Sequence, residues 1–475
     1  MDMNISCDVA VLGGGTGGYV AAIRAAQLGK QVVIIEADKL GGTCLHRGCI
    51  PSKSLLRSAE VYADIQGSES YGIETSGAKL VFSKVQNRKN AIVDQLHQGV
   101  QYLMRKNKIQ VLKGKGRVIG PSIFSPKSGA VAVELADGEM ETVVPTNLII
   151  ATGSRPRTLP GLEPDGRYIL TSDDALVMDE LPESILIVGG GVIGVEWASM
   201  LNDFGVRVTV VEAADQLLPA EDQDVARELQ KLLAKRGVTI HTGGMVQTDT
   251  YQVQDGQVSI EMRKGEKNEI LSASCMLVSV GRQANVENIG LENTDVRVEK
   301  GVIAVNKFLQ TGEAHIYAIG DVIGGLQLAH AASHEGIAAV NHLAGESIHK
   351  VPEHMIPRCV YTRPEVASVG WTEKEARRNG HEVKVGKFPF QAIGKALVYG
   401  SKEGFVKVVA DAKTNDILGV QMIGAHVTDL ISEAALAQVL DATPWEVGQM
   451  VHPHPTLAEV IGEAMLAVDG MSIGM

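Results

Sequence analysis

The chain of 475 residues has few cysteines, few aromatic residues and no long uncharged apolar run. Cysteine occurs 5 times, and aromatic residues make up 4% of the sequence. A membrane helix needs about 18 consecutive apolar residues, and none of the apolar runs is that long, so no membrane span is expected. Scarce aromatics leave little for stacking on bases. The net charge of −12 disfavours nucleic acid or an anionic membrane surface as the main partner.

The sparing use of cysteine indicates a reducing compartment, where a disulfide is mostly catalytic. Cys7, Cys275 and Cys359 are isolated in the sequence and suggest no role of their own. Since they form no second ligand pair, no metal site is expected. A strand-like run begins within the first ten residues and leaves no room for a signal peptide. We therefore expect a soluble, cytoplasmic protein.

Two cysteines, Cys44 and Cys49, lie five positions apart in a glycine-rich segment. A regular helix would hold their α-carbons roughly 8–9 Å apart, whereas a disulfide needs them within roughly 7 Å. If the two are bonded, the backbone must leave helical geometry, and Gly48 supplies that freedom. Pro51 suits the first turn of a helix that begins near Cys49, where Lys53 should help a thiol to ionise. The pattern favours a redox-active pair, with two structural cysteines or half of a metal site as alternatives.

A unit of strand, glycine turn, helix and strand opens the chain and predicts a dinucleotide-binding fold. Residues 8–12 and 31–35 read as buried strands, and residues 19–28 read as a helix. The motif residues are Gly13, Gly15, Gly18 and Glu36. The first glycine makes the tight turn, the second lets a pyrophosphate approach, and the third allows the helix to pack closely on the strand. The acid can accept a hydrogen bond from a ribose hydroxyl.

The same unit returns later in the chain, which predicts a second dinucleotide site. Its strand covers residues 185–188, and its motif residues are Gly189, Gly191, Gly194 and Glu212. The spacing from the last glycine to the acid is 18 residues in both units. A carboxylate at Glu212, with no arginine after it, accepts from a 2′-hydroxyl and repels a 2′-phosphate. The second site should therefore bind NAD rather than NADP.

Other segments complete the α/β pattern. A helix is expected over about residues 85–103, with one apolar stripe formed by Ile92, Leu96 and Val100. Strand ends followed by turns occur at Thr152-Gly153 and at Gly281-Arg282. A further strand runs into Gly320-Asp321 before a helix over residues 329–343, and this acid can hold a polyol chain.

The character of the sequence changes from about residue 352 onward. Strand-like runs at residues 405–409 and 418–423 precede a helix at 430–440. A pair of histidines among prolines follows, and Glu459 lies five residues after His454. A carboxylate can orient an imidazole and raise its basicity, so the pair is an acid–base candidate, with an exposed loop as the alternative.

Over essentially its whole length the chain resembles the flavoprotein disulfide reductases. The segments that carry the resemblance are residues 41–53, 17–29 and 361–367. Residues that differ from the commonest ones in that family are Thr16, His46 and Arg363. We expect none of the three to contact a residue with a chemical role.

The resemblance implies an α/β fold with two Rossmann-like dinucleotide-binding domains and a C-terminal α+β dimerisation domain. The expected parts are an FAD-binding domain with the redox disulfide at 1–153, an NAD-binding domain at 154–281, a central domain that completes the FAD site at 282–351, and an interface domain at 352–475. An obligate homodimer follows.

The resemblance also implies roles for individual residues. Cys44 would be the outer, interchange thiol and Cys49 the thiol against the flavin. His454 would be the acid–base catalyst that acts on the partner subunit's disulfide, oriented by Glu459, and the His454–Pro455 peptide is a candidate cis bond. The remaining cofactor-binding residues would be Lys53 paired with Glu196, Asp321 on the flavin's polyol or pyrophosphate, and the turn residues Thr152, Gly153, Gly281 and Arg282.

Within this family, the implied activity is oxidation of dihydrolipoyl groups on 2-oxo acid dehydrogenase or glycine cleavage complexes, with electrons passing through the disulfide and FAD to NAD. The implied partners are lipoyl domains and the acyltransferase core of such a complex. Glutathione reductase is an alternative that Glu212 opposes. Mercuric reductase and high-molecular-weight thioredoxin reductase need a C-terminal cysteine pair, which residues 471–475 lack. A complex subunit with a structural flavin is the alternative outside the enzymes.

Overall fold

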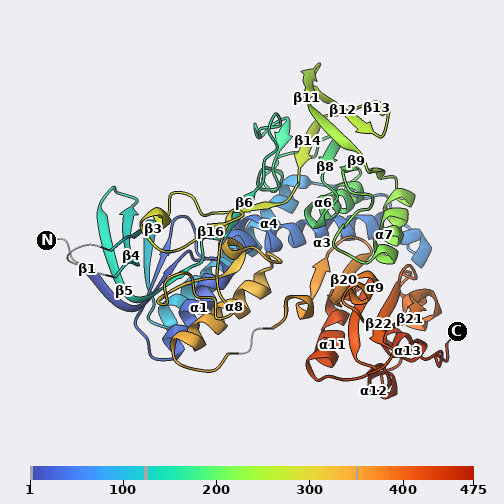
Figure 1. The fold of residues 1–475 in the computed structure, drawn as a ribbon. Coiled ribbons are helices and arrows are strands. Elements are labelled where there is room, and N and C mark those ends of the chain that lie inside the picture. The colour runs from blue at the N-terminus through green and yellow to red at the C-terminus, as the bar shows by residue number, and fades with distance from the viewer. Residues whose placement is uncertain (1–3, 122–126, 349–350, 475) are drawn as a thin grey trace. The chain divides into compact units, whose positions relative to one another are not determined.

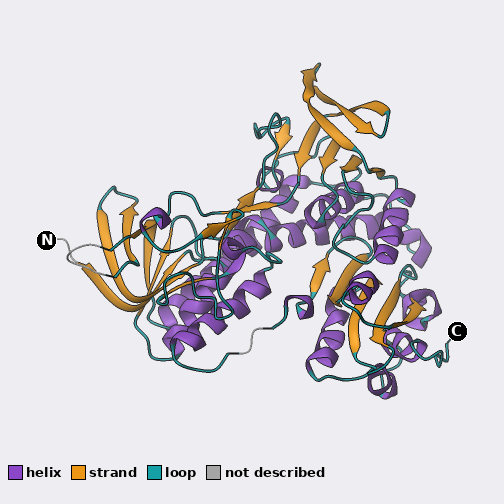
Figure 2. Ribbon diagram, in the orientation of Figure 1, coloured by secondary structure: helices purple, strands orange, loops and turns teal. Residues whose placement is uncertain are grey.

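The structure is a computed structural model that describes residues 4–121, 127–348 and 351–474. Its contacts divide the chain into two compact units. The first comprises residues 1–54, 83–157 and 282–351, and the second comprises 55–82, 158–281 and 352–475. Both units contain helices and strands (Figure 2). Across the described residues, none of the helices has the length and apolar character needed to cross a membrane.

The first unit is built on a six-stranded sheet of β1 (Asn4–Leu12), β2 (Val32–Glu36), β3 (Gln110–Ile119), β4 (Ala130–Leu135), β5 (Met140–Ile150) and β18 (Ile316–Ala318). Strand β1 lies between β2 and β5 and runs parallel to both, with Leu12 opposite Ile35 and Ile150. Strand β4 is antiparallel to β3 and β5. Because both faces of β1 are covered, its last four residues are all apolar and buried.

Helices α1 (Thr16–Gln27) and α8 (Ala329–Leu343) lie side by side in this unit (Figure 1). Small residues let them approach, since a Cβ on Gly17 would lie 2.9 Å from the Ala332 carbonyl oxygen. The other helices that begin in or next to this unit are α2 (Gly42–Arg47), α3 (Cys49–Gln66) and α4 (Phe82–Lys106). Two small strand pairs join β6 (Ser154–Pro156) to β15 (Arg282–Ala284) and β16 (Val298–Glu299) to β17 (Val302–Ile303).

The second unit holds a five-stranded parallel sheet in the order β10 (Thr239–Thr242), β9 (Arg207–Glu212), β8 (Ser184–Val188), β14 (Cys275–Val278) and β7 (Ile169–Leu170). Its helices are α5 (Ser172–Ala175), α6 (Val192–Asp203) and α7 (Gln223–Lys235). An antiparallel sheet follows from β11 (Met245–Gln254), β12 (Gln257–Lys264) and β13 (Lys267–Ala273). This part repeats the strand–turn–helix–strand order of β1, α1 and β2.

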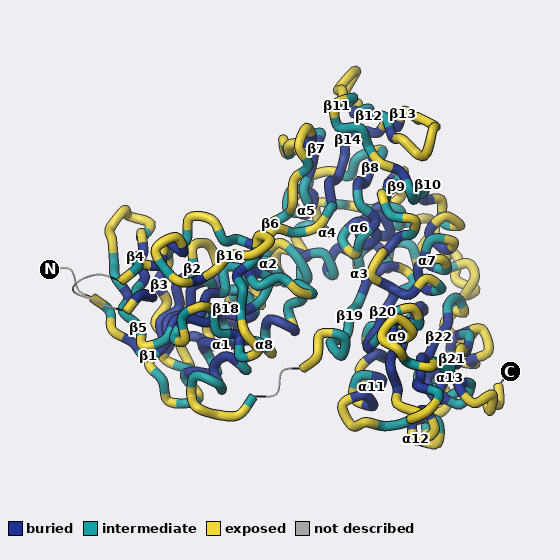
Figure 3. Tube along the Cα trace, in the orientation of Figure 1, coloured by how far each residue is buried: buried dark blue, intermediate teal, exposed yellow. Residues whose placement is uncertain are grey.

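The C-terminal part of the second unit is α+β. Its antiparallel sheet has the order β19 (Arg358–Val360), β20 (Glu365–Gly370), β23 (Ile417–Gly424), β22 (Phe405–Asp411) and β21 (Val383–Pro389). Its helices are α9 (Glu373–Arg378), α10 (Gly394–Val398), α11 (Val427–Val439), α12 (Pro444–Gln449) and α13 (Glu459–Ala467). Every residue of β22 and β23 is buried. Burial concentrates on the strands and leaves loops exposed (Figure 3).

The expected fold class is confirmed, with small shifts at element ends. Helix α1 begins at Thr16, three residues before the predicted start at position 19, because its first turn carries the motif glycines. The apolar stripe predicted on α4 is partly wrong. Val100 is buried, whereas Leu96 is 43% exposed. Helical periodicity indicates which face is apolar, but not how far along the helix a neighbouring element covers it.

Candidate active site

The two cysteines lie on either side of a break between two helices. Helix α2 ends at Arg47, Gly48 has φ −147° and ψ −111°, and α3 begins at Cys49. The predicted departure from helical geometry at Gly48 and the predicted helix start are therefore confirmed. Cys44 and Cys49 are present as thiols, and a side-chain hydrogen bond links them. The backbone geometry thus brings the two sulfur atoms together.

The surroundings of Cys44 decide how its proton is held. The hydrogen bond with Cys49, burial and the charge of Cys49 raise the pKa of the Cys44 thiol, while a hydrogen bond from Thr16 and the charge of Lys53 lower it. Ionisation of Cys44 is therefore opposed by burial and by Cys49, because two negative sulfurs this close repel each other. The expectation that Thr16 contacts no residue with a chemical role was wrong. Its turn packs against the cysteine segment through a hydrogen bond from Gly41 N to Gly14 O of 2.8 Å.

The two glycine turns have the same backbone. Gly13 and Gly189 have φ of +109° and +108°, a region that favours glycine. Side chains on Gly18 and Gly194 would overlap the carbonyl oxygens of the first glycine of their own turn. The sequence-based roles of tight turn and close packing are therefore both visible in the geometry.

The two acids hold the turns in the same way. Glu36 Oε2 accepts from Gly14 N at 2.7 Å, and Glu36 Oε1 accepts from Asp38 N at 2.7 Å. Glu212 Oε2 accepts from Gly190 N at 2.6 Å, and its Oε1 accepts from Ala214 N at 2.7 Å. Each carboxylate thus links its turn to the loop after the second strand of its unit.

The residues present fit a dinucleotide at both turns. A Cβ on Gly191 would meet nothing within 4 Å, and one on Gly15 would meet only Gly42 Cα at 4.0 Å. Both glycines are the N-caps of their helices, and because glycine has no side chain, neither can cover the first N–H groups of its helix. Their position leaves open backbone at the start of α1 and α6, which suits a pyrophosphate.

The predicted turn residues gather mainly in the first unit. Thr152 Oγ1 donates to Asn285 O at 2.8 Å. Ser154 donates its hydroxyl hydrogen bond to Asp321 Oδ2, and Arg282 Nε donates to Ser154 Oγ at 2.7 Å. Arg282 follows the second repeat in the sequence, yet its Nε lies 3.8 Å from Asp321 Oδ2 in the first unit. An added Cβ on Gly153 or on Gly281 would meet nothing within 4 Å.

Lys53 and Glu196 lie on helices. Lys53 is on α3, one turn after Cys49, and its charge acts on Cys44. Glu196 is on α6 and is 6% exposed, and its Oε1 accepts from Tyr361 N at 3.0 Å.

His454 and Glu459 form the predicted histidine–carboxylate pair. Nδ1 of His454 lies 2.7 Å from Oε1 of Glu459, and Oε2 accepts from Thr456 N at 2.9 Å. Burial raises the pKa of Glu459, but the hydrogen bonds from His454 and Thr456 outweigh it and lower the pKa. The His454 side chain is 76% exposed, so the free imidazole edge is available to another molecule. The predicted cis peptide at His454–Pro455 is present.

Sequence reasoning missed a second pair of this kind. His452 Nε2 lies 2.8 Å from Glu433 Oε1, and this imidazole is 8% exposed. The His-Pro-His-Pro pattern drew attention to one histidine, while Glu433 lies on α11, 19 residues earlier. Because His452 is buried, it anchors the loop that carries His454.

The other cysteines are separate from this pair. Burial raises the pKa of Cys7 and of Cys275 to about 11 each, so neither is a nucleophile near neutral pH. Cys359 Sγ lies 3.8 Å from Thr428 O.

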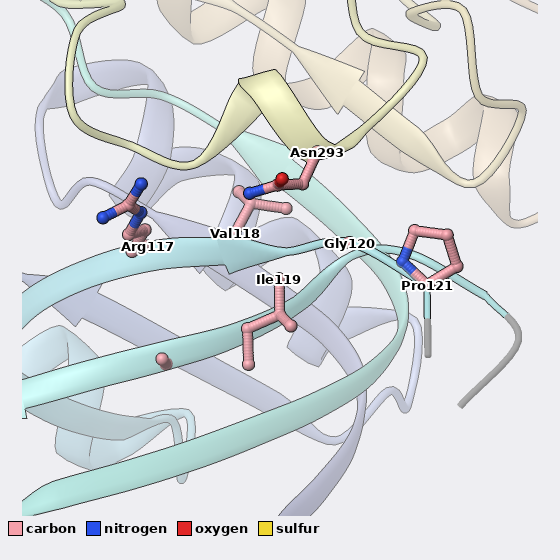
Figure 4. Close-up of a pocket in the computed structure, with 7 residues that line it drawn as sticks. Arg117, Val118, Ile119, Gly120, Pro121 and Asn293 are labelled. Atoms are coloured by element: carbon pink, nitrogen blue, oxygen red, sulfur yellow. The ribbon is translucent and has the colours of Figure 1, made fainter. Parts of the chain in front are cut away.

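A shallow pocket of about 510 Å³ is lined by residues such as Arg117, Gly120 and Asn293 (Figure 4). It contains no predicted site residue. Within the described ranges, no group of three or more His, Cys, Asp or Glu side chains is arranged to hold a metal ion.

Two glycine-turn repeats, a close cysteine pair and a histidine–carboxylate pair define a dinucleotide-dependent disulfide oxidoreductase. Residues 7–336 match the family described as pyridine nucleotide-disulphide oxidoreductase, and residues 356–465 match the dimerisation domain of that family. The chain belongs to this family. The dimerisation-domain match supports a homodimer.

Within the family, the chain groups with dihydrolipoyl dehydrogenases over nearly its whole length. One from Bacillus subtilis (strain 168) is 62% identical, with 98% of this chain and 98% of that protein covered. One from Zymomonas mobilis subsp. mobilis is 43% identical, with 98% of each chain covered. These matches favour the dihydrolipoyl branch over the glutathione- and mercuric-reductase alternatives.

Solved structures share the fold of this chain. The crystal structure of LpdA from Mycobacterium tuberculosis has a TM-score of 0.89 at 27% identity, covering 97% of this chain and 99% of that chain. The HOCl-induced flavoprotein disulfide reductase RclA from Escherichia coli, in its Cu(II) complex, has a TM-score of 0.85 at 27% identity, covering 98% and 99%.

Proposed function

We propose that this chain is an FAD-containing, NAD-linked dihydrolipoyl dehydrogenase. The observation that carries the proposal is the hydrogen-bonded pair of Cys44 and Cys49 at the start of α3, packed against the first glycine turn. When the pair is oxidised to a disulfide, it can take two electrons from a dithiol by exchange, and the two cysteines so reduced can pass those electrons to a dinucleotide cofactor held at that turn.

The residues of the first turn would hold FAD. Gly13, Gly15 and Gly18 would admit its pyrophosphate, Glu36 would accept from its ribose, and Asp321 would bind its polyol or pyrophosphate. When bound, FAD supplies the two-electron chemistry between the cysteine pair and NAD. The second turn, with Glu212, would hold NAD.

The proposed thiol chemistry uses four residues. His454 takes a proton from the dihydrolipoyl group, and Glu459 orients its imidazole at 2.7 Å. The resulting thiolate attacks Cys44 and opens its disulfide with Cys49. The exposure of His454 supports action on another subunit. The pairing of Lys53 with Glu196 stays a prediction.

We propose the same four parts as the sequence suggests: FAD-binding residues 1–153, NAD-binding residues 154–281, a central part at 282–351 and an interface part at 352–475. The proposed partners are lipoyl domains and the acyltransferase core of a 2-oxo acid dehydrogenase or glycine cleavage complex. A cytoplasmic location agrees with a redox-active pair beside otherwise isolated cysteines.

The test uses Cys49→Ser in the purified holoenzyme, with Cys359→Ser as a matched control. Cys49→Ser should keep its FAD, lose dihydrolipoamide-driven NAD reduction, and still pass electrons from NADH to ferricyanide. Cys359→Ser should keep its FAD, its dihydrolipoamide-driven NAD reduction and its electron transfer from NADH to ferricyanide. Lipoamide turnover at the parental rate by Cys49→Ser would refute the proposed route.

A further inference from the structure

The first glycine turn and the cysteine segment meet backbone to backbone, and this contact brings Thr16 to Cys44. Gly15 and Gly41 pair as a single parallel β-bridge outside the named strands. A Cβ on Gly42 would lie 2.6 Å from Gly15 Cα, so a larger residue does not fit at the crossing. Thr16 follows directly as the first residue of α1. The backbone position of Thr16 is therefore fixed by this crossing of two glycine backbones.

Two side chains on the first turn of α1 interact with Cys44. The Thr16 hydroxyl hydrogen-bonds to the Cys44 sulfur. Tyr19, three residues further along the helix, has its pKa raised by burial and then by the charge of Cys44. The other titratable groups that act on Cys44 are Cys49 and Lys53 on α3. Among all these groups, Thr16 alone has a side chain that does not titrate.

We propose that Thr16 is a positioning residue whose hydroxyl donates to Cys44 Sγ and stabilises that sulfur as a thiolate. A thiolate has no proton to give, so the hydroxyl must be the donor when Cys44 is ionised. A hydrogen bond to a charged group is among the stronger ones in a protein. Thr16 thus offsets part of the burial that opposes ionisation of Cys44.

The catalytic consequence rests on the proposed function. In the first exchange, a dihydrolipoyl thiolate bonds to Cys44 Sγ, the bond between Cys44 and Cys49 breaks, and Cys49 leaves as a thiolate. Before the second exchange, His454 releases its first proton to solvent; the remaining dihydrolipoyl thiol then gives its proton to His454 and attacks its neighbouring sulfur. The bond to Cys44 then breaks, Cys44 leaves as a thiolate, and the two electrons stay on the cysteine pair.

Thr16 acts on the second exchange, because a leaving thiol of lower pKa leaves faster. The same hydrogen bond favours the reverse reaction, in which the Cys44 thiolate attacks an oxidised lipoyl group. Thr16→Val keeps the branched shape and removes the hydroxyl, whereas Thr16→Ser keeps the hydroxyl and removes the methyl group. The two variants separate a role of the hydroxyl from a role of packing.

The test measures how the rate of alkylation of Cys44 and of Cys49 depends on pH in the chemically reduced holoenzyme. The protein is reduced with a phosphine, desalted anaerobically, pulsed with iodoacetamide and digested with trypsin. Cleavage after Lys39, Arg47 and Lys53 puts Cys44 and Cys49 on separate peptides, residues 40–47 and 48–53, which mass spectrometry quantifies. This readout requires no lipoamide or NAD, so it stands even if the proposed function fails.

Thr16→Val should move the alkylation midpoint of the Cys44 peptide up by about one pH unit, which is about tenfold slower reaction below the midpoint. Thr16→Ser should match the parent. Coincident profiles for Thr16→Val and the parent would overturn the proposal, as would equal shifts in both variants. If Thr16→Val loses FAD or helical signal, Thr16→Ala replaces it, with the same expected shift and the same refuting results.

Discussion

Replacing Glu212 by glutamine should weaken NAD binding and reduce the preference for NAD over NADP. Both carboxylate oxygens accept backbone hydrogen bonds, from Gly190 N at 2.6 Å and from Ala214 N at 2.7 Å. Glutamine keeps one acceptor and turns an NH₂ group toward the other N–H. The carboxylate is also proposed to accept a hydrogen bond from the ribose of NAD, and loss of one hydrogen bond to a charged group costs about 1.5–3 kcal/mol. The KM for NAD should therefore rise by about 10- to 150-fold.

The same change removes a negative charge that opposes a 2′-phosphate. Two unit charges 4 Å apart interact by about 1 kcal/mol in water and about 4 kcal/mol near a protein surface. Glu212→Gln should therefore shift the ratio of kcat/KM values for NAD and NADP toward NADP by at least about fivefold.

The internal repeat supplies a matched control in Glu36→Gln. Glu36 accepts from Gly14 N and Asp38 N, both at 2.7 Å, in the first turn. This variant should lower FAD retention and leave the NAD to NADP ratio of the remaining holoenzyme unchanged. The assay is steady-state dihydrolipoamide oxidation at varied NAD and NADP, normalised to bound flavin. An unchanged ratio in Glu212→Gln, or an altered one in Glu36→Gln, would refute the assignment of the two sites.

Two further predictions concern packing and charge in the second unit. Gly194→Ala would press a methyl group against the backbone at the base of its turn. Overpacking of this kind costs about 1–3 kcal/mol, so the Tm should fall in thermal scans and the NAD affinity should fall in titrations. A parental Tm would contradict the packing argument. Lys407 is 5% exposed, and its Nζ lies 3.1 Å from Asp222 and 3.2 Å from Asp224, so Lys407→Met should cost about 3–5 kcal/mol of unfolding free energy. Burial raises the pKa of Asp224, but Lys407 outweighs it and holds that pKa below its ordinary 3.8. The stability from this pair is therefore fully present above pH 3.8 and is lost as the pH falls through the lowered pKa. In urea unfolding, the loss of unfolding free energy caused by Lys407→Met should be smaller at pH 3 than at pH 7.

Local patterns were enough to predict the repeated units. The glycine spacing and the acid 18 residues after it are properties of one strand–turn–helix–strand unit. The geometry of that unit follows from steric limits on a few backbone positions. The helix break at Gly48 was predictable for the same reason, since a close cysteine pair is incompatible with a continuous helix.

The contacts that sequence reasoning missed all join distant segments. Thr16 reaches Cys44 because Gly15 and Gly41 pair across two turns, and no local pattern encodes that pairing. Arg282 reaches Asp321 through Ser154, which lies 128 positions earlier than Arg282. Such contacts depend on how strands assemble into a sheet, so they require the fold.

The central claim is that the cysteine pair links dihydrolipoyl groups to NAD. NAD reduction by dihydrolipoamide with the purified flavoprotein, run beside NADP and beside glutathione, tests it most directly. We predict rapid turnover with dihydrolipoamide and NAD, and little with NADP or with glutathione. A yellow protein that binds FAD yet shows no dihydrolipoamide turnover, or that turns over glutathione with NADP, would contradict the account.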